Sequence, residues 1–178
     1  MNYATTINAI IDKEKGYVDH PSDRGGPTKF GITETVARLN GFTGNMQDLP
    51  RDFAAAVYTR RYIQEPKFNK VEELSPTIAE ELIDTGVNMG PGMASLFFQK
   101  LLNAFNRRGK DYSDIFVDGR IGPASLGAFA AFLKFRGAEG EQVFLKALNH
   151  IQGGRYLDIA ENNESQEDFF YGWIKNRT

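Results

Sequence analysis

Three residues near the amino terminus have the types and spacing needed to cut a glycosidic bond. Glu14 is followed nine residues later by Asp23 and five residues after that by Thr28. A glycosidase needs one acid that protonates the leaving oxygen and a second carboxylate that positions water or acts as nucleophile. A helix-end acid facing a hairpin-borne carboxylate and hydroxyl would supply both. Taken alone, Asp23 is also an ordinary turn residue, because residues 22–25 read Ser-Asp-Arg-Gly.

Glu14 interrupts an apolar pattern in the helix expected over residues 3–15. At about 100° per residue, Glu14 falls about 20° from Ile7, inside a stripe that also contains Ile10 and Ile11. The last turn of a helix further disfavours a negative charge by roughly 0.3–1 kcal/mol. Partial burial and this helix end both favour the protonated carboxyl that a general acid requires. The alternative is that the helix ends before Glu14 and the side chain turns to water.

The composition disfavours several other chemistries. The 178 residues include no cysteine and only two histidines, His20 and His150. No thiol nucleophile is available, and a catalytic zinc with its usual three protein ligands is poorly supplied. The formal net charge is -2, and Lys and Arg form no dense block, so a nucleic-acid partner is disfavoured.

Mostly helical elements must position these groups. After the first helix, the Gly- and Pro-rich stretch 17–32 predicts a small β-hairpin, built from pieces at 17–18 and 29–32. Further helices are predicted from caps, prolines and apolar patterns over residues 33–41, 48–63, 75–89, 93–105, 123–135, 139–160 and 165–175. Gly153-Gly154 is a predicted weak point. The predicted fold class is all-α, a helical bundle with a small β-hairpin between its first two helices.

The chain is long enough for one domain with two lobes. It is 41% hydrophobic over 178 residues, which can bury a sizeable core. The turn-rich stretch 106–118 predicts a lobe boundary there, which gives lobes of residues 1–106 and 107–178. The loop 118–123 is interpreted as structural, because the spaced acidic ligands of a calcium loop are missing.

Several segments resemble glycoside hydrolase family 108, which contains phage endolysin-type N-acetylmuramidases. The family pattern is Glu-Gly-Gly-Tyr and then Asp-x-Gly-Gly-x-Thr-x-x-Gly-Ile-Thr, and residues 14–17 and 23–33 are similar to it except at Lys15. The Tyr-rich segment 56–62 and the segment 84–90 also match family segments. Residues 117–123 and 172–177 resemble the peptidoglycan-binding region often joined to the family at its carboxyl end.

This resemblance implies a lysozyme-like fold and a role for each site residue. Glu14 would protonate the glycosidic oxygen after N-acetylmuramic acid, Asp23 would orient or activate water or stabilise positive charge at the anomeric carbon, and Thr28 would hold that water. Residues that would line the sugar groove are Tyr17, Tyr58, Tyr62 and Asn88. The tyrosines at 58 and 62 are spaced i,i+4 and could instead be ordinary packing, and Asn88 could lie on a solvated face.

The implied activity is hydrolysis of the β-1,4 bond between N-acetylmuramic acid and N-acetylglucosamine by a bacteriolytic lysozyme. Residues 107–178 would form a helical peptidoglycan-binding lobe packed on the catalytic lobe. The expected partner is the peptidoglycan glycan strand, with no metal, cofactor or nucleic acid, and the chain is expected to be a monomer.

The expected site of action follows from what the chain lacks. No apolar stretch approaches the ~20 residues of a membrane span, so stable membrane insertion is not expected. The start, residues 1–7, has no basic region and no signal-peptide hydrophobic segment. We therefore expect synthesis in the cytoplasm and action on the cell wall after holin-type release or another form of export.

Two other functions stay open. A lytic transglycosylase uses a single acid/base Glu and ends in an anhydro sugar, but it needs no positioned water, which Asp23 and Thr28 would supply. A non-catalytic wall-binding or secretion-accessory protein is the second alternative, and the presence of Glu14, Asp23 and Thr28 argues against it.

Overall fold

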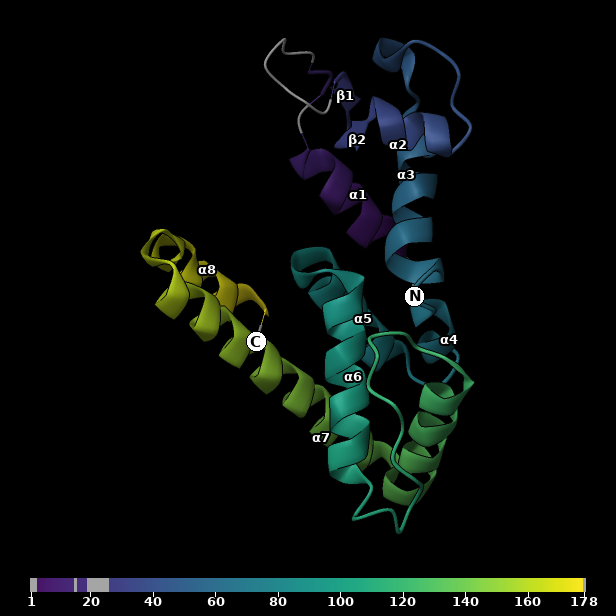
Figure 1. The fold of residues 1–178 in the computed structure, drawn as a ribbon, viewed down its shortest axis with the longest axis vertical. Coiled ribbons are helices and arrows are strands. Elements are labelled where there is room, and N and C mark those ends of the chain that lie inside the picture. Colours follow the sequence, from purple (N-terminus) through teal and green to yellow (C-terminus); the bar gives the residue numbers. More distant parts are fainter. Residues whose placement is uncertain (1–2, 15, 19–25, 178) are drawn as a thin grey trace. The chain divides into compact units, whose positions relative to one another are not determined.

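The described part of the chain is mainly helical. The computed structural model describes residues 3–14, 16–18 and 26–177, which form two compact units, residues 1–65 and 66–178 (Figure 1). Eight α-helices and one two-stranded antiparallel sheet make up the regular structure of these described residues. The predicted all-α class is therefore confirmed, as is a small hairpin between the first two helices.

The first unit is built around two neighbouring helices. Helix α1 (Tyr3–Lys13) packs against α3 (Arg51–Thr59), which continues into a π-helical turn, Arg60–Gln64 (Figure 1). Between them in sequence lie β1 (Thr28–Lys29), β2 (Ile32–Thr33), α2 (Glu34–Leu39) and a 3-10 turn, Met46–Asp48. The core of this unit consists of apolar side chains, among them Ile7, Ile11, Ile32, Ala37, Leu49, Ala54 and Ile63.

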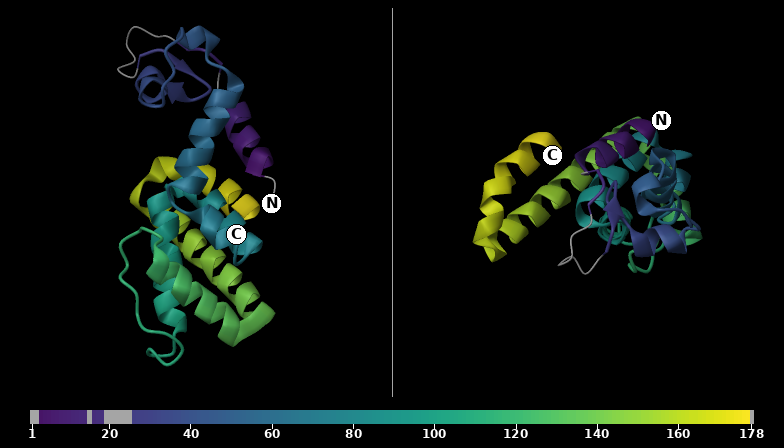
Figure 2. Two further views of the ribbon diagram at one scale, coloured as in Figure 1. Left: turned by 90° about the vertical axis from the view of Figure 1, so that its right-hand side faces the viewer. Right: turned by 90° about the horizontal axis from the view of Figure 1, so that it is seen from above.

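The second unit contains the remaining helices. They are α4 (Phe68–Glu72), α5 (Pro76–Met89), α6 (Pro91–Phe105), α7 (Pro123–Asn162), a 3-10 turn (Glu164–Gln166) and α8 (Glu167–Arg177) (Figure 2). The sequence did not predict α4, because five residues are too few to show a helical period. Phenylalanines from α6 and α7 fill the core. The ring centroid of Phe98 lies 5.1 Å from that of Phe129 and 5.5 Å from that of Phe144.

Two predicted helix starts are confirmed by their caps. The Thr33 side chain accepts a hydrogen bond from the Val36 backbone N–H at 3.4 Å at the start of α2. The Ser75 hydroxyl accepts one from the Ile78 N–H at 3.1 Å, and Pro76 occupies the first position of α5. Such caps satisfy backbone donors that have no partner inside the helix.

Helix α7 bends at one glycine and continues through two others. Gly137 has φ 61° and ψ -156°, so α7 consists of two arms, and the predicted break between residues 135 and 139 is confirmed. The helix continues through Gly153-Gly154, in agreement with the single helix predicted over residues 139–160, and the weak point there stays a prediction. Gln152 is buried there and donates to the Thr85 hydroxyl at 2.9 Å. Packing of this face outweighs the roughly 1 kcal/mol that each helical glycine costs.

The loop 118–123 is fixed by one buried amide, as expected of a structural loop. The Gln99 Nε2 donates to Asp118 Oδ1 and to the Arg120 carbonyl, both at 3.0 Å. Its Oε1 accepts from the Asp118 and Gly119 N–H groups at 3.1 and 2.8 Å. Within the described ranges, His, Asp and Glu side chains nowhere gather in a group of three or more that could hold a metal ion.

The compact units divide the chain after residue 65, whereas the predicted lobes divide it after residue 106. Helices α6 and α7 pack together within the second unit, so residues on both sides of 106 share one core. That residues 107–178 act as a separate wall-binding lobe stays a prediction. None of the helices in the described residues has the length and apolar character to cross a membrane.

Candidate active site

Glu14 directly follows helix α1. The helix ends at Lys13, and the Glu14 N–H still donates to the Ile10 carbonyl at 3.2 Å. Ile7 and Ile11 are 3% and 1% exposed, but Glu14 itself is exposed. The expectation of a half-buried Glu14 within the apolar stripe is therefore wrong, and the alternative, a helix that ends before Glu14 and leaves its side chain exposed, is confirmed. An exposed carboxyl remains open to a bound substrate.

A tight hairpin lies opposite this helix end. Thr28 pairs with Thr33 and Lys29 with Ile32, which leaves Phe30 and Gly31 as a two-residue turn. Their φ angles are 53° and 73°, and two positive values are those of a type I′ hairpin turn. The strand β1 also exchanges two 2.8 Å backbone hydrogen bonds between Thr28 and Val18. The segment that follows Glu14 is thereby attached to the hairpin.

Gly31 brings the hairpin turn into contact with Glu14 and Tyr58. A Cβ atom on Gly31 would lie 2.8 Å from both Cγ and Cδ of Glu14, and 2.4 Å from the Tyr58 Oη. Real Cβ contacts are essentially never shorter than 3.0 Å. The carboxyl group and the phenol therefore converge on a place that only a residue without a side chain leaves open.

Tyr58 is held rigidly beside this carboxyl. It is 7% exposed, and its hydroxyl donates to the Phe30 carbonyl at 3.0 Å. The ring of Tyr62 stacks on it, with centroids 6.0 Å apart and planes 15° apart. Burial, and then the negative charge of Glu14, raise the pKa of Tyr58 to about 12. The phenol therefore stays neutral at physiological pH.

The other predicted site residues have different surroundings. Thr28 is half-buried in β1, and its hydroxyl donates to the Gly26 carbonyl at 3.2 Å, which leaves the oxygen able to accept a hydrogen bond. Tyr17 is half-buried. Asp23 lies outside the described residues. The structure thus brings Glu14 together with Tyr58, and Thr28 lies in the hairpin that contacts them.

Asn88 belongs to α5 of the second unit. Its side chain is exposed and donates to the backbone carbonyl of Asp84 at 2.7 Å and to its Oδ2 at 3.2 Å. Asn88 also lines a cavity of about 270 Å³ with side chains that include Met93, Tyr156 and Trp173. An exposed amide at a cavity edge is able to bind an N-acetyl group, although part of its donor capacity already goes to Asp84.

Gly31 is a site residue that the sequence did not predict. Its signal was the pair Phe30-Gly31 inside the predicted β-like piece 29–32, since a two-residue hairpin turn requires positive φ and favours glycine. Its contact with residues 14 and 58 depends on how α1 and α3 pack, which no local pattern reveals.

Tyr58 should titrate unusually late. Because its folded-state pKa of about 12 lies above the ordinary tyrosine value of 10.0, its contribution to stability is complete below pH 10 and is lost as the pH rises through 12. We expect a late phase in the phenolate absorbance, to which Tyr112, also raised to about 12, contributes as well. In Tyr58→Phe the absorbance change of that phase should fall by the contribution of one tyrosine side chain. An unchanged amplitude would contradict the buried environment of Tyr58.

Family comparisons agree with the motifs in the sequence. Residues 7–90 match the family model of glycosyl hydrolase 108, and residues 93–178 match that of a predicted peptidoglycan domain. The first match includes Glu14, Thr28, Tyr58 and Asn88. The resemblance to this family, with a peptidoglycan-binding region at its carboxyl side, is confirmed.

A solved structure supports the fold. The chain is similar to Brucella abortus SagA, with 22% sequence identity and a TM-score of 0.59, over 97% of this chain and 87% of that one. At this identity the likeness concerns the fold alone. No curated protein matches the chain in sequence.

Proposed function

We propose that the protein is an N-acetylmuramidase, because residues 7–90 match the family model of glycosyl hydrolase 108 and residues 93–178 match that of a predicted peptidoglycan domain. It would hydrolyse the β-1,4 bond between N-acetylmuramic acid and N-acetylglucosamine. The observation that carries the proposal is the convergence of Glu14 and Tyr58 on Gly31, at the turn of the hairpin that contains Thr28.

Glu14 is the proposed general acid. Its side chain is exposed, so a glycosidic oxygen can reach it, and it lies next to a phenol that remains neutral. Tyr58 acts as a positioning residue, because its hydroxyl is tied to the Phe30 carbonyl and its ring is fixed by burial. A general acid works only when it is held within hydrogen-bond reach of the atom it protonates.

Asp23 and Thr28 are the proposed water-side groups. Asp23 would act as the second carboxylate that glycoside hydrolysis requires. The Thr28 hydroxyl, which donates a hydrogen bond to the Gly26 carbonyl, would accept a hydrogen bond from the attacking water.

Aromatic residues of the first unit are the proposed sugar contacts. Tyr62 is half-buried and stacks on Tyr58, and the Arg61 guanidinium lies 5.5 Å from its ring centroid. Such faces suit the C–H surfaces of a pyranose ring. Tyr17 and the Asn88 amide would add contacts to the glycan. Residues 93–178 would hold the wall polymer, in accordance with their match to a predicted peptidoglycan domain.

The proposed setting is a bacteriolytic, endolysin-type enzyme. The monomer would be made in the cytoplasm and would act on the wall after holin-type release or another export. This part of the proposal rests on the sequence motifs.

Mass spectrometry of digested peptidoglycan tests the activity. A muramidase leaves N-acetylmuramic acid with a reducing end, one water heavier than the anhydro sugar of a lytic transglycosylase. We expect the reducing-end product. Anhydro products would identify the protein as a lytic transglycosylase instead. If the folded protein leaves the sacculi undigested, its role would be non-catalytic wall binding.

Thr28→Ala should lower the hydrolysis rate while the chain remains folded. The substitution removes the oxygen that would hold water, together with a local hydrogen bond to Gly26. We expect a loss of about tenfold, which corresponds to one hydrogen bond of about 1.4 kcal/mol. Turnover of soluble peptidoglycan fragments and the thermal midpoint should be measured on one sample. Full activity would restrict Thr28 to a role in the turn.

A further inference from the structure

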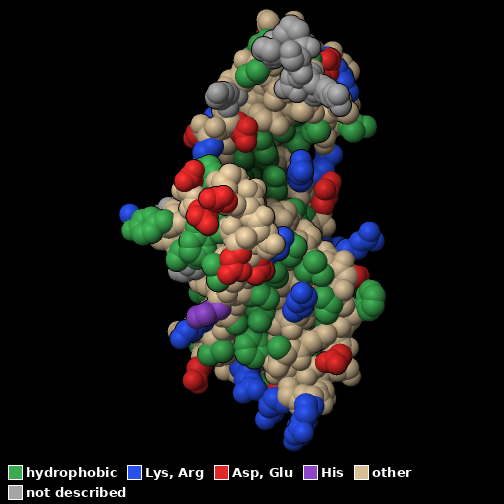
Figure 3. All heavy atoms as spheres, turned by 60° about the vertical axis from the view of Figure 1, so that its left-hand side comes forward, with side chains coloured by type: hydrophobic (Ala, Val, Ile, Leu, Met, Phe, Trp, Pro, Cys, Tyr) green, Lys and Arg blue, Asp and Glu red, His purple; other side chains and the backbone are tan. Residues whose placement is uncertain are grey.

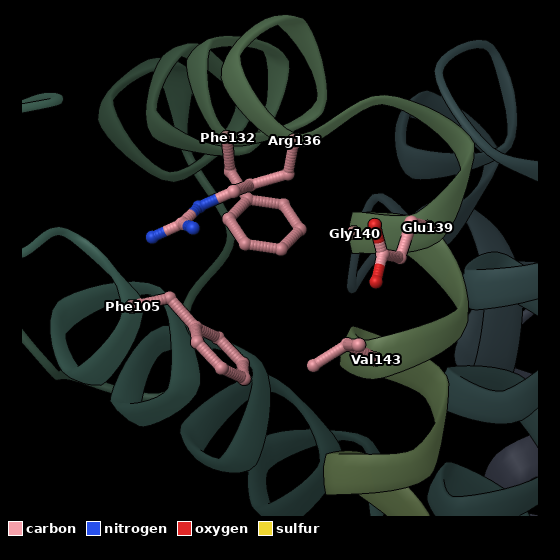
Figure 4. Close-up of a pocket in the computed structure, with 6 residues that line it drawn as sticks. All are labelled: Phe105, Phe132, Arg136, Glu139, Gly140 and Val143. Carbon is pink, nitrogen blue, oxygen red and sulfur yellow. The ribbon is translucent and has the colours of Figure 1, made fainter.

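A second cavity lies in the second unit, where α6 ends and α7 bends. It has a volume of about 300 Å³ and is lined by Phe105, Phe132, Arg136, Glu139, Gly140 and Val143 (Figure 4). All six residues belong to the second compact unit, so the cavity is not formed by the residues of the proposed active site.

Two glycines make this cavity possible. Gly137, with φ 61°, separates the arms of α7, so that Arg136 comes from one arm and Glu139 from the other. A Cβ on Gly140 would lie 2.1 Å from the Arg136 Cβ and 3.5 Å from the Phe132 Cζ. The missing side chain at 140 therefore lets the Arg136 stem pass over the second arm.

The cavity combines an apolar floor with two opposite charges. The rings of Phe105 and Phe132 are 5.3 Å apart, and Val143 is beside them (Figure 4). Figure 4 shows the Arg136 guanidinium and the Glu139 carboxylate on different sides of the Phe132 ring. Such a lining suits a small ligand that is apolar in the middle and charged at both ends.

Both charged groups are able to bind a ligand. The Arg136 side chain is 40% exposed and forms a long ion pair with Asp111, in which the 3.9 Å separation of Nη2 from Oδ2 leaves its N–H groups without a hydrogen bond to that carboxylate. That carboxylate is instead bound by Arg107, whose Nε lies 2.9 Å from the same oxygen. Glu139 is exposed and has no hydrogen bond or ion pair to any residue of the described ranges.

Nearby charge favours an anionic group at the Arg136 side. The turn after α6 contributes the exposed residues Arg107, Arg108 and Lys110. Figure 3 shows Lys and Arg side chains gathered at this end of the second unit. Asp111 and Asp114 of the same turn offset two of these charges, and the remaining positive charge, together with Arg136, raises the concentration of anions near it.

We propose that this cavity binds the carboxyl-terminal end of the peptidoglycan peptide stem. The terminal carboxylate would accept two parallel hydrogen bonds from Arg136, the D-alanyl methyl groups would pack on Phe105 and Phe132, and the ammonium group of the preceding diamino acid would pair with Glu139. A volume at the lower end of the ~300–1,000 Å³ range of ligand pockets suits a short peptide better than a glycan chain. The choice of peptidoglycan as the source of this peptide rests on the proposed function.

Binding should be measured by NMR titration of the full chain with Nα-acetyl-L-lysyl-D-alanyl-D-alanine. We expect a Kd of about 1 mM, typical of a small ligand with few contacts. Arg136→Gln should weaken binding about tenfold or more, since it removes a charged hydrogen-bond donor. Lys134→Gln is the matched control, because it removes the same charge from an exposed position on the same arm outside the cavity lining, and it should bind as the wild type does.

Matched ligands separate the three contacts. The tripeptide with a carboxyl-terminal amide should bind the wild type as weakly as the unmodified tripeptide binds Arg136→Gln. The tripeptide acetylated at the lysine Nε should bind the wild type more weakly than the unmodified tripeptide does. For Glu139→Gln, this acetylation should cause no further loss of affinity. Equal affinity for the L-alanyl-L-alanine analogue would overturn the wall peptide as the ligand. An absence of saturable binding to the folded wild type would overturn the proposal, as would equal affinities for the acid and the amide.

Wall hydrolysis by the same preparation separates this inference from the proposed function. Hydrolysis without tripeptide binding would leave the muramidase intact and overturn the stem-peptide site. Tripeptide binding without hydrolysis would support the stem-peptide site and overturn the muramidase.

Discussion

Replacing Glu14 with glutamine should lower the rate of wall hydrolysis about 10²–10⁴-fold. The amide keeps the shape of the side chain but has no proton to give to the leaving oxygen, and general acid catalysis contributes about that factor. Because Glu14 is exposed, stability should change by less than about 0.5 kcal/mol. The measurement is the rate of peptidoglycan hydrolysis per folded molecule, with the thermal midpoint taken on the same sample.

Glu65→Gln is the control for this substitution. It makes the same chemical change at another exposed position of the first unit, and hydrolysis should continue at the wild-type rate. Tyr58 supplies a second readout that is independent of activity. The negative charge of Glu14 is one cause of its raised pKa, so in Glu14→Gln the pKa of Tyr58 should fall below about 12. Near wild-type hydrolysis by folded Glu14→Gln would exclude Glu14 as the acid.

Much of the fold is predictable from the sequence, because its signals are local. The Thr33 and Ser75 caps are each defined by a few neighbouring residues, and the structure shows both. The break between residues 135 and 139 also has a local cause, a glycine in a conformation that other residues rarely adopt. At Gly153-Gly154 the predicted helix continues, and buried side chains such as Gln152 and Tyr156 lie before and after the two glycines.

The candidate site is less predictable, because it depends on contacts between elements. A helical wheel placed Glu14 by its angle, but whether it is covered depends on where α1 ends. The residue types at 14, 28 and 58 indicated the chemistry. That Gly31 lies between two of them follows from the packing of α1, α3 and the hairpin turn. Gly31 therefore gives a test of the site that the sequence motifs alone could not have suggested.

Gly31→Ala should reduce hydrolysis by about 10²-fold or more. The new methyl group would lie 2.4 Å from the Tyr58 Oη and 2.8 Å from two Glu14 carbons, so both side chains must move. A displacement of about 1 Å in a catalytic group can cost about 10²-fold in rate. The positive φ of 73° also destabilises the variant, by about 1–2 kcal/mol, because alanine rarely adopts it. Hydrolysis must therefore be expressed per folded molecule.

Gly41→Ala separates strain from displacement. Gly41 also has a positive φ, 90°, but a Cβ there would meet no atom within 4 Å. Gly31→Ala should lose more stability than Gly41→Ala, because its methyl group also displaces the buried Tyr58, and only Gly31→Ala should lose hydrolysis per folded molecule. Tyr58→Phe in the Gly31→Ala background removes the oxygen closest to the new methyl group. The methyl group can then move toward position 58, so it displaces Glu14 less, and part of the hydrolysis rate should return. If folded Gly31→Ala hydrolyses the wall as fast as Gly41→Ala does, the convergence of Glu14 and Tyr58 on this turn has no part in catalysis.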